Sequence, residues 1–479
     1  MMAKYLPHFV NICTIHNVSE HCMLKYVSRI STYYRYYSSA LLVPSSKRTQ
    51  TFSFVTPYLD FDDKIKNMEK LTEQLKYRTQ ELKANDVKNM WQFYKLVNTD
   101  KCRLEERSDE ISKRMSKFFS KKELTEEEQA EFAKLKLQNE TVKTDLKSVK
   151  NIIDDLQESV LLKLLQLPNE LDKRTPPQTP EVLKQGNVFN QQDGPKYPRS
   201  HIRIGKDLGL LEFKNPMLYF LCNEAALFEL GVLSYAGVIL SKSNLIRVAG
   251  SDFSRSVVVE GCGLNHEDSS DAFLIHNHSD VNEGSSNRMH LVGGASLISF
   301  LAMHTKQLIN PRHLPIGYFS TGRQYTPYHP KTPSIGLFNV CQASAAVIFV
   351  LTQNFEEYNN QYNMLYNTVC SLYDNICGNY EVVIRPASHL KPWESMRVSF
   401  ELWSTFLKQY VEVGHISLCG NYFSKRLLIS YQTATGRDFP FVISGTVLSV
   451  PRLLGCLLEQ STEKFDIPAK IRKHMHDVL

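Results

Sequence analysis

The chain has 479 residues, 42% of them hydrophobic and 22% charged, which is ordinary for a soluble globular protein with two or three domains. Its formal net charge of +6 permits nucleic-acid binding but does not establish it. The ten cysteines form no CxxC pair, which argues against a disulfide framework, and no apolar run approaches the roughly eighteen residues of a membrane span, the longest being 343–351.

The first 50 residues have the composition of a mitochondrial transit peptide. They contain one acidic residue, Glu20, against six Lys and Arg residues, together with many Ser and Tyr residues. The segment Arg35–Ser38 resembles a matrix-protease cleavage site. We therefore expect residues 1–50 to be a leader that directs the protein to the mitochondrial matrix. A disordered basic tail is the alternative.

Residues 62–167 have the Lys-, Glu-, Gln- and Leu-rich composition of long exposed helices. Apolar residues recur every seven positions in a first helix: Met90, Val97, Leu104, Ile111 and Phe118. In a second helix they recur at spacings of three and four: Phe132, Leu135, Val142, Leu146, Val149, Ile153, Leu156 and Val160. This pattern predicts an antiparallel coiled-coil arm, which Pro168 ends. Thr125 and Glu128 predict a capping box at the start of the second helix.

The tip of this arm, expected near residues 119–124, carries a run of basic residues without an intervening acid. They are spaced closely enough to contact successive phosphates. We take them as candidate nucleic-acid-binding residues: Lys113, Arg114, Lys117, Lys121 and Lys122. A solvated helix face is the alternative meaning of such a charge run.

Residues 168–200 are rich in Pro, Gln and Asn and predict a linker. Residues 201–479 alternate short β-rich runs with helical ones, which predicts an α+β domain in which helices flank an antiparallel sheet. Strands are expected within residues 271–278, 334–341, 343–351, 380–387 and 426–431.

Residues 412–459 predict two strands followed by a helix. Lys425–Tyr431 is short and rich in β-forming residues, a Gly-containing turn follows it, and Phe439–Val442 is the expected partner strand. After Gly445 the apolar residues recur at helical spacing. Arg452 should therefore lie on a helix that points back at the sheet.

This strand–strand–helix unit with its arginine resembles the last part of the ATP site in class II aminoacyl-tRNA synthetases, and the chain is most similar to seryl-tRNA synthetases. LLQLPNEL and HIRIGKDLGLLEF also match the family's sequences at the end of the arm and at the start of the catalytic domain. The resemblance implies a class II synthetase-type domain preceded by a tRNA-binding coiled-coil arm. It also implies dimerisation through an apolar helix and strand, where we assign Leu227, Leu230 and Leu233 to the interface.

The resemblance assigns three residues to an ATP site. Arg323 falls on the motif 2 arginine, Arg452 falls on the motif 3 arginine, and Glu412 matches a carboxylate that contacts ATP and metal. We interpret this site as vestigial. For the two arginines we favour a structural role, in which they tie strands together, because most of their functional partners are missing.

The other positions of the family's site carry different residues. A motif 2 glutamate is replaced by Tyr325, and a metal-binding serine by His415. The Thr-Ala-Glu that binds the serine ammonium group aligns with 294–296, which would leave that group without an anionic partner. Further replacements are Asn339 for a cation, Cys341 for an imidazole, Val347 for a glutamate, Ser444-Gly445-Thr446 for Asn-Gly-Ser, and Pro451 for a glycine.

Cys262, His266, His276 and His278 could suggest a metal site, but their spacing fits no standard zinc pattern, so we expect none. No P-loop or dinucleotide fingerprint is present.

We therefore expect a degenerate, non-catalytic mitochondrial paralogue of seryl-tRNA synthetases that uses no cofactor. It should bind tRNA (serine tRNA in the first place) or another mitochondrial RNA. Its expected protein partner is the active mitochondrial seryl-tRNA synthetase, in a heterodimer, or a second copy of itself, and no membrane insertion is expected. The alternatives are a divergent but active mitochondrial serine–tRNA ligase, and a structural dimer partner that does not touch RNA.

Overall fold

A computed structural model describes most of the chain. The described residues are 39–41, 55–58, 60–80, 82–119, 125–156, 160–186, 198–276, 288–328, 333–377, 379–460 and 463–475. The expected leader lies outside them apart from residues 39–41. The chain divides into two compact units. The smaller contains residues 61–68 and 82–166 (the arm), and the larger contains residues 69–81 and 167–479 (the body).

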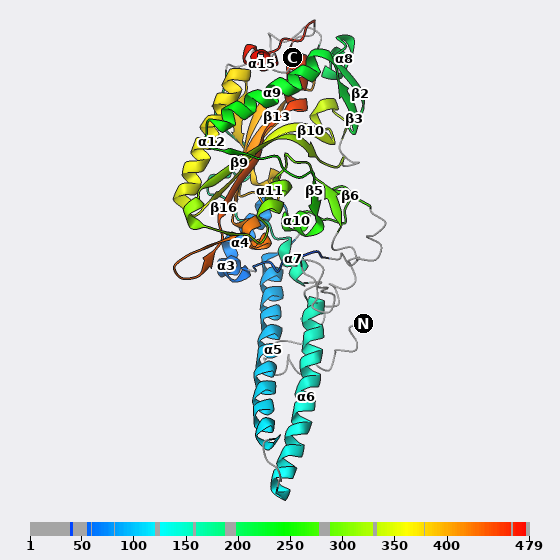
Figure 1. The fold of residues 1–479 in the computed structure, drawn as a ribbon. Coiled ribbons are helices and arrows are strands. Elements are labelled where there is room, and N and C mark those ends of the chain that lie inside the picture. Colours follow the sequence, from blue (N-terminus) through cyan, green and yellow to red (C-terminus); the bar gives the residue numbers. More distant parts are fainter. Residues whose placement is uncertain are drawn as a thin grey trace. The chain divides into compact units, whose positions relative to one another are not determined.

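Two long helices form the arm: α5 (Ala84–Phe119) and α6 (Glu126–Leu156), preceded by the short α3 (Phe61–Lys66) and followed by α7 (Leu162–Leu165). The helices α5 and α6 run antiparallel in Figure 1, because Phe118 packs on Phe132 while Glu105 pairs with Lys150. The expected capping box is confirmed. The N–H of Thr125 donates to the Glu128 carboxylate at 3.2 Å, and the N–H of Glu128 donates to the Thr125 hydroxyl at 3.4 Å.

The apolar residues of the arm face the seam between α5 and α6, as predicted. Among the predicted seam residues the buried ones are Met90, Val97, Ile111, Leu135, Val142, Val149, Ile153, Leu156 and Val160. One polar residue, Asn139, interrupts the seam. Its amide donates to the Met115 sulfur at 3.8 Å, and its carbonyl oxygen is buried without a hydrogen-bond partner in the described structure.

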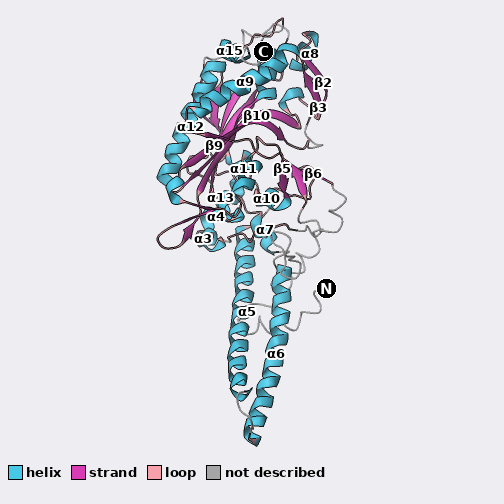
Figure 2. Cartoon of the chain, in the orientation of Figure 1, coloured by secondary structure: helices cyan, strands magenta, loops and turns pink. Residues whose placement is uncertain are grey.

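An eight-stranded sheet, drawn in magenta in Figure 2, forms the centre of the body. Its order is β1-β11-β12-β13-β16-β10-β9-β4, and every neighbouring pair is antiparallel except β4 with β9. The strands are β1 (Glu181–Gln185), β4 (Ile246–Arg247), β9 (Ile316–Tyr325), β10 (Gln342–Thr352), β11 (Glu381–Ile384), β12 (Met396–Ser404), β13 (Gln409–Gly420) and β16 (Phe441–Ser449). The segment expected to be only a linker therefore contributes the edge strand β1.

Three small sheets accompany the large one. They are formed by β2 (Leu211–Asn215) with β3 (Leu218–Leu221), by β5 (Phe253–Arg255), β6 (Phe273–Ile275) and β7 (Met289–Leu291), and by β8 (Leu308–Ile309), β14 (Ser430–Gln432) and β15 (Arg437–Asp438). The remaining body helices are α4 (Met68–Tyr77), α8 (His201–Asp207), α9 (Asn223–Ser241), α10 (Ser256–Gly261), α11 (Leu297–His304), α12 (Phe355–Ile376), α13 (Tyr422–Leu427), α14 (Val450–Gln460) and α15 (Ala469–Met475).

The two faces of the large sheet pack against different helices. Along β10, Ala346, Ile348 and Val350 join a core with α8, α9, α12, α14 and α15, whereas Val347 and Phe349 join a core with α10, α11 and α13. This alternation is what the period of a β-strand requires when both of its faces are buried. The predicted α+β class is confirmed. We refer to the two sides as the α9 face and the α11 face.

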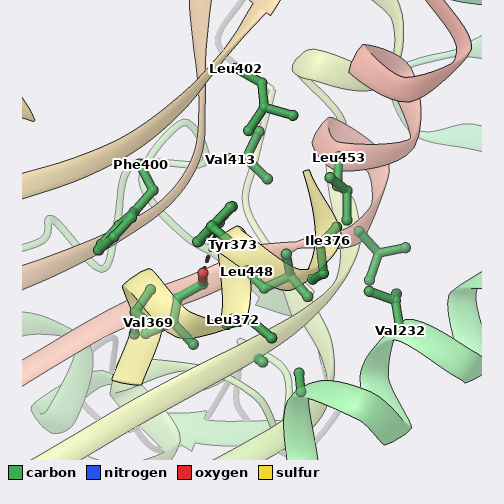
Figure 3. Packing of buried hydrophobic residues seen from close by; sticks show 14 of the residues in the cluster. Val232, Val369, Leu372, Tyr373, Ile376, Phe400, Leu402, Val413, Leu448 and Leu453 are labelled. Atoms are coloured by element: carbon green, nitrogen blue, oxygen red, sulfur yellow. Dashed lines mark hydrogen bonds between the residues drawn. The ribbon is translucent and has the colours of Figure 1, made fainter. Parts of the chain in front are cut away.

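Two β-bulges shape the centre of the sheet. The register shifts at Val447 in β16 and at Val413 in β13. The hydroxyl of the buried Tyr373, which is stacked on Phe400, donates to the Val447 carbonyl at 2.9 Å (Figure 3). Gly414 permits this arrangement, since a Cβ there would collide with that carbonyl and with the Tyr373 hydroxyl.

A second glycine lies opposite on β16. A Cβ at Gly445 would collide with the carbonyl oxygen of His415 on β13. Each glycine therefore makes room for a carbonyl oxygen of the neighbouring strand, so that β13 and β16 can pack closely at this point.

Parts of the predicted secondary structure were wrong. Lys425–Leu427 lies in α13, and only residues from Ser430 onward form a strand. Phe441–Val442 belongs to β16, which pairs with β10 and β13 rather than with β14. The helix that carries Arg452 begins at Val450 instead of directly after Gly445. Residues 336–338 form a 3₁₀ turn, not a strand. The other predicted strands and the helical position of Arg452 are confirmed within the described residues.

The expectation that no stretch could span a membrane needs correction for α9. By length and composition α9 is the one described helix that could cross a bilayer, but 44% of its most apolar stretch is buried inside the body. Phe228, Val232 and Leu240 are completely buried in the core on the α9 face. A core helix of a soluble protein meets the same criterion, so this finding alone does not indicate a membrane span.

Candidate functional site

A cavity of about 300 Å³ opens on the α11 face of the sheet. Strands β9, β10, β13 and β16 meet there, and each contributes residues that sequence analysis had singled out. These residues are Tyr325, Val347, His415, Ser444, Gly445 and Thr446, joined by Ser296 at the start of α11; Gln324 on β9 lies beside them. The rest of the lining includes Cys262, Asp271, Lys391, Trp393, Glu394, Arg397 and Ser417. The structure thus brings together positions that are up to 150 residues apart in the sequence (Ser296 to Thr446).

Arg323 does not line this cavity. Arg323 on β9 pairs with Ser344 on β10. Ser344 is two residues from Ala346, whose side chain packs in the core on the α9 face, so Ser344 and Arg323 also point to that face. Its guanidinium lies 3.1 Å from the Glu229 carboxylate on α9, which also accepts a hydrogen bond from the Ser344 hydroxyl at 2.7 Å. These contacts tie β9 and β10 to α9, which is the structural role that we favoured for Arg323.

Arg452 also makes structural contacts. From the first turns of α14 its guanidinium donates to the Phe338 carbonyl at 3.1 Å and to the Glu412 carbonyl at 3.0 Å. The same guanidinium lies 3.7 Å from the Glu412 carboxylate. Arg452 therefore holds the turn before β10 and the middle of β13 together.

Glu412 is bound by a residue that sequence reasoning missed. Arg397, on β12, donates from Nε to Glu412 Oε2 at 3.0 Å and from Nη2 to Oε1, and its Nη1 donates to Glu394 at 2.9 Å. The Ser399 hydroxyl donates to Glu412 Oε2 at 2.6 Å. The His415 ring lies 3.3 Å from Glu412 Oε1. This set, Glu394, Arg397, Ser399, Glu412, His415 and Ser417, is called the Arg397 cluster below.

Electrostatics keep the Arg397 cluster in one protonation state. Burial opposes ionisation of Glu412, but the Arg397 guanidinium and the His415 ring outweigh it and hold the pKa of this carboxyl well below its usual range. Burial and the positive charge of Arg397 lower the pKa of His415. Glu412 is therefore ionised and His415 neutral near pH 7.

Three of the four potential metal ligands named from the sequence lie in the described part of the chain. Cys262 and His266 are buried and His276 is exposed, while His278 lies outside the described residues. Burial raises the pKa of the Cys262 thiol, which disfavours the thiolate that a metal would need. Among the described residues no three His, Cys, Asp or Glu side chains are placed to hold a metal ion together. All eight cysteines in the described ranges are free thiols.

One loop of the cavity wall, residues 391–395, is held by two other segments of the body. Arg78 donates to the carbonyls of Lys391 and Glu394, and Asn169 donates to those of Pro392 and Trp393. Burial lowers the pKa of Arg78 to about 10, which leaves it charged at neutral pH. Arg78 and Asn169 stand just before and just after the arm in the sequence, so both chain segments that lead into the arm support this wall.

Comparison with known proteins agrees with this architecture. The family described as tRNA synthetase class II core domain (G, H, P, S and T) matches residues 284–461. Among solved structures, the seryl-tRNA synthetase of Pyrococcus horikoshii complexed with ATP aligns with a TM-score of 0.69 at 18% identity, over 87% of this chain and 98% of that one. The chain has the class II seryl-tRNA synthetase fold.

Sequence relatives include both synthetase-like proteins and ligases. The serine–tRNA synthetase-like protein Slimp of Drosophila melanogaster is 27% identical over 433 residues, covering 89% of this chain and 90% of that protein. The mitochondrial serine–tRNA ligase of Mus musculus is 21% identical over 441 residues, covering 88% and 83%. The resemblance to seryl-tRNA synthetases is therefore confirmed, and it extends to a synthetase-like protein of an insect.

The arginine of the Arg397 cluster could not have been found from local sequence. RVSFELW predicts a strand, and nothing in it distinguishes a functional arginine from a surface one. The partners of Arg397 lie on the loop before β12 and on β13, and a bulge shifts Glu412 into reach. Only the register of the sheet brings these residues together.

Proposed function

We propose that this chain is a non-catalytic, seryl-tRNA synthetase-like protein that binds tRNA through its arm and acts in the mitochondrial matrix. The observation that supports the loss of catalysis is the lining of the cavity. Positions where seryl-tRNA synthetases hold their substrate-binding groups converge on it, yet they carry Ser296, Tyr325, Val347 and His415. These side chains supply no anion to a substrate ammonium group and no cation to a phosphate.

The carboxylates that do line the cavity are engaged within the chain. Asp271 is exposed at the rim and accepts the N–H of Asn265 at 2.9 Å. Glu394 is bound by Arg397. Neither is at Ser296 or Val347, the positions where the resemblance places the glutamates of the serine site, so the cavity offers no anion there.

A divergent but active serine–tRNA ligase is the second candidate, because Arg323, Glu412 and Arg452 are retained. Serine-dependent exchange of pyrophosphate into ATP separates the two functions. We expect background exchange with the wild-type protein at saturating serine and ATP. Exchange above background that Arg452→Ala abolishes would establish the ligase, and a Val347→Ala variant controls for a general disturbance of the cavity.

RNA binding is proposed for the basic end of α5. Lys113, Arg114 and Lys117 are exposed there, whereas Lys121 and Lys122 lie outside the described residues. Phosphate contacts give an affinity that falls with salt in proportion to the charges engaged. Changing all five to Gln should weaken binding of serine tRNA and flatten its salt dependence.

The matched control removes basic residues from another part of the arm. Lys134, Lys136 and Lys143 are exposed on α6, away from its N-terminal end. Their triple Gln variant should retain most of the affinity. Equal loss in both variants would indicate unspecific attraction to a basic surface, and no binding by the wild-type protein would favour the purely structural dimer partner.

The proposed partner surface is the outer side of α9 and its neighbours. Leu230 is 48% exposed, and Leu227 and Leu233 are half-buried. Further exposed apolar side chains follow on adjacent segments: Met217, Leu218, Phe220, Val238 and Ile246. So much exposed apolar surface is typical of an interface. We propose a dimer through this surface, with the active mitochondrial seryl-tRNA synthetase as the partner and a homodimer as the alternative.

Co-expression with the active enzyme, followed by native mass spectrometry, tests this assembly. Leu230→Asp should dissociate the dimer, whereas Leu137→Asp, at an exposed leucine of α6, should not. A stable homodimer that never exchanges subunits with the enzyme would exclude the heterodimer. Unchanged assembly of Leu230→Asp would place the interface elsewhere.

The mitochondrial location rests on the composition of residues 1–50 and on relatives that include mitochondrial serine–tRNA ligases of mouse and cattle. Mass spectrometry of the protein from isolated mitochondria should find an N-terminus near Ser38 or later. An intact Met1 on the organelle-resident protein would contradict cleavage.

A further inference from the structure

The fold family implies a divalent metal ion next to ATP, and by resemblance Glu412 would contact it. The surroundings of Glu412 show whether a metal ion fits there. Oε2 accepts hydrogen bonds from Arg397 Nε at 3.0 Å and from the Ser399 hydroxyl at 2.6 Å. Oε1 accepts from Arg397 Nη2 and lies 3.3 Å from the His415 ring. Both lone pairs of Oε2 and at least one of Oε1 are therefore used within the chain.

The neighbouring carboxylate is occupied in the same way. Glu394 is almost completely buried, and its Oε1 accepts from Arg397 Nη1 at 2.9 Å and from the Ser417 hydroxyl at 2.5 Å. Its Oε2 accepts the N–H of Lys391 at 2.7 Å. One planar guanidinium thus bridges two carboxylates, and it does so with charge-assisted hydrogen bonds, which are the strong kind.

The local charge is balanced without any added ion. Glu394 and Glu412 supply two negative charges, and Arg397 supplies one positive charge. Arg452, 3.7 Å from Glu412, supplies the second. A divalent cation here would have to displace a guanidinium whose side chain is only 15% exposed. Mg²⁺ sheds its own water reluctantly and needs several open oxygen ligands in regular geometry, whereas most lone pairs of these two carboxylates already accept hydrogen bonds. The residues present therefore do not fit the metal.

We propose that Arg397 takes the place of the metal ion, as a cation that is part of the chain, so that this protein neither requires nor admits a divalent cation at Glu412. This inference deepens the proposed function and rests on its premise that the site does no catalysis. It assigns Arg397 as the residue that determines the ion specificity of the site. It also implies that the cavity side of β12 and β13 holds its arrangement without nucleotide or metal.

Removing the Arg397 guanidinium should create a binding site for a divalent cation. In Arg397→Met, Glu412 would lose two hydrogen-bond donors and Glu394 would lose one, while the hydroxyls of Ser399 and Ser417 would remain beside these carboxylates. Carboxylate and hydroxyl oxygens are ligands that suit Mn²⁺ and Mg²⁺. Methionine keeps the length of the side chain but carries no charge. We therefore expect Arg397→Met to bind one Mn²⁺ ion and the wild-type protein to bind none at this place.

The experiment measures Mn²⁺ binding by electron paramagnetic resonance, and thermal unfolding with and without millimolar Mn²⁺, on the full chain. Arg385→Met is the matched control. Arg385 also ion-pairs with a buried carboxylate, lying 2.6 Å from Glu401, and its Nε donates to the Ser399 hydroxyl at 3.3 Å. Within the described residues no hydrogen bond joins it to Glu394 or Glu412, so its removal leaves both carboxylates with all their donors. Wild type and Arg385→Met should show no saturable site. Arg397→Met should bind one ion and gain thermal stability from it, and adding Glu412→Gln should abolish both effects.

Several outcomes would overturn the proposal. One is a wild-type Mn²⁺ site that Glu412→Gln removes, and another is a folded Arg397→Met variant that binds no Mn²⁺. If Arg397→Met does not fold alone, refolding in Mn²⁺ should recover it, and failure to do so also counts against the proposal. Pyrophosphate exchange by a wild-type protein without Mn²⁺ at Glu412 would refute the proposed function alone. Mn²⁺ at Glu412 without exchange would refute this inference alone.

Discussion

The first prediction concerns His201, which opens α8 at the entry to the body. The Leu337 N–H donates to His201 Nε2 at 3.0 Å, so the ring proton must be on Nδ1, which lies 2.7 Å from Glu459 Oε1. Glu459 is completely buried near the end of α14, and its Oε2 accepts the N–H of Phe406 at 3.2 Å and the hydroxyl of Ser404. A neutral imidazole is thus one of the donors that solvate a buried carboxylate.

Removing this donor should be costly. His201→Ala takes away the strongest contact of Glu459 Oε1 and leaves the Leu337 N–H unpaired. A hydrogen bond to a charged group typically contributes about 1.5–3 kcal/mol and a buried donor left unpaired costs about 1–3 kcal/mol, so we expect the free energy of unfolding to fall by roughly 3–5 kcal/mol. His201→Asn places an amide N–H where Nδ1 stood and loses only the acceptor for Leu337. It should cost about 1–2 kcal/mol, which is typical of one buried hydrogen bond.

Urea unfolding followed by the fluorescence of the body tryptophans, Trp393 and Trp403, measures these differences. Far-UV circular dichroism at low urea checks that each variant is folded before comparison. The order should be wild type, then His201→Asn, then His201→Ala. If the Asn and Ala variants lose equal stability, the donor to Glu459 is not what matters. A loss below about 1 kcal/mol for His201→Ala would refute the reasoning altogether.

Three further predictions concern stability. Tyr373→Phe leaves the Val447 carbonyl unpaired in the core and should lower the free energy of unfolding by about 1–2 kcal/mol in the same urea assay; an unchanged midpoint would contradict it. Burial, with His266 nearby, lowers the pKa of His290 to about 4 in the folded protein. Because the unfolded chain binds this proton at a higher pH than the folded protein does, the free energy of unfolding falls as the pH drops from 6.5 to 4. His290→Gln should reduce this fall by at most about 3 kcal/mol, measured by urea unfolding at each pH. Identical pH profiles of the variant and the wild type would contradict this prediction. Asn139→Leu removes a buried unpaired oxygen from the arm and should stabilise it by about 1 kcal/mol in thermal circular dichroism, which a lower midpoint would contradict.

The arm could be predicted from sequence because its signals are local. The apolar spacing around Val142 and the capping box at Thr125 depend only on residues within a few turns, and the structure reproduces both. The predicted strand at Lys425 was wrong because the deciding contacts are not local. KRLLISY is rich in β-forming residues, but contacts with distant elements decide the conformation: the Ser424 hydroxyl donates to the Pro440 carbonyl at 2.7 Å, and Leu427 packs in the core on the α11 face.

The candidate site was predictable in its membership but not in its geometry. Val347, His415 and Thr446 were assigned to one pocket through the family's motifs, and they do line one cavity. That Arg323 faces away from this cavity follows from its pairing with Ser344, and sheet register cannot be read from a single strand. Arg397 escaped notice because its role depends on a bulge at Val413 in the neighbouring strand.

Gly414 and Gly445 have a consequence for how such a chain can change over generations. Substitutions of partly exposed residues on the cavity wall, such as Gln324 and Tyr325, mainly alter what the pocket can hold, because these side chains are not part of the core. Any side chain at either glycine would instead push β13 and β16 apart and disrupt the centre of the sheet. Mutational drift at exposed positions of the cavity can therefore change its binding properties while the sheet is retained, whereas drift at these two glycines cannot. Two positions without side chains thus hold the centre of the sheet together, whatever the cavity binds.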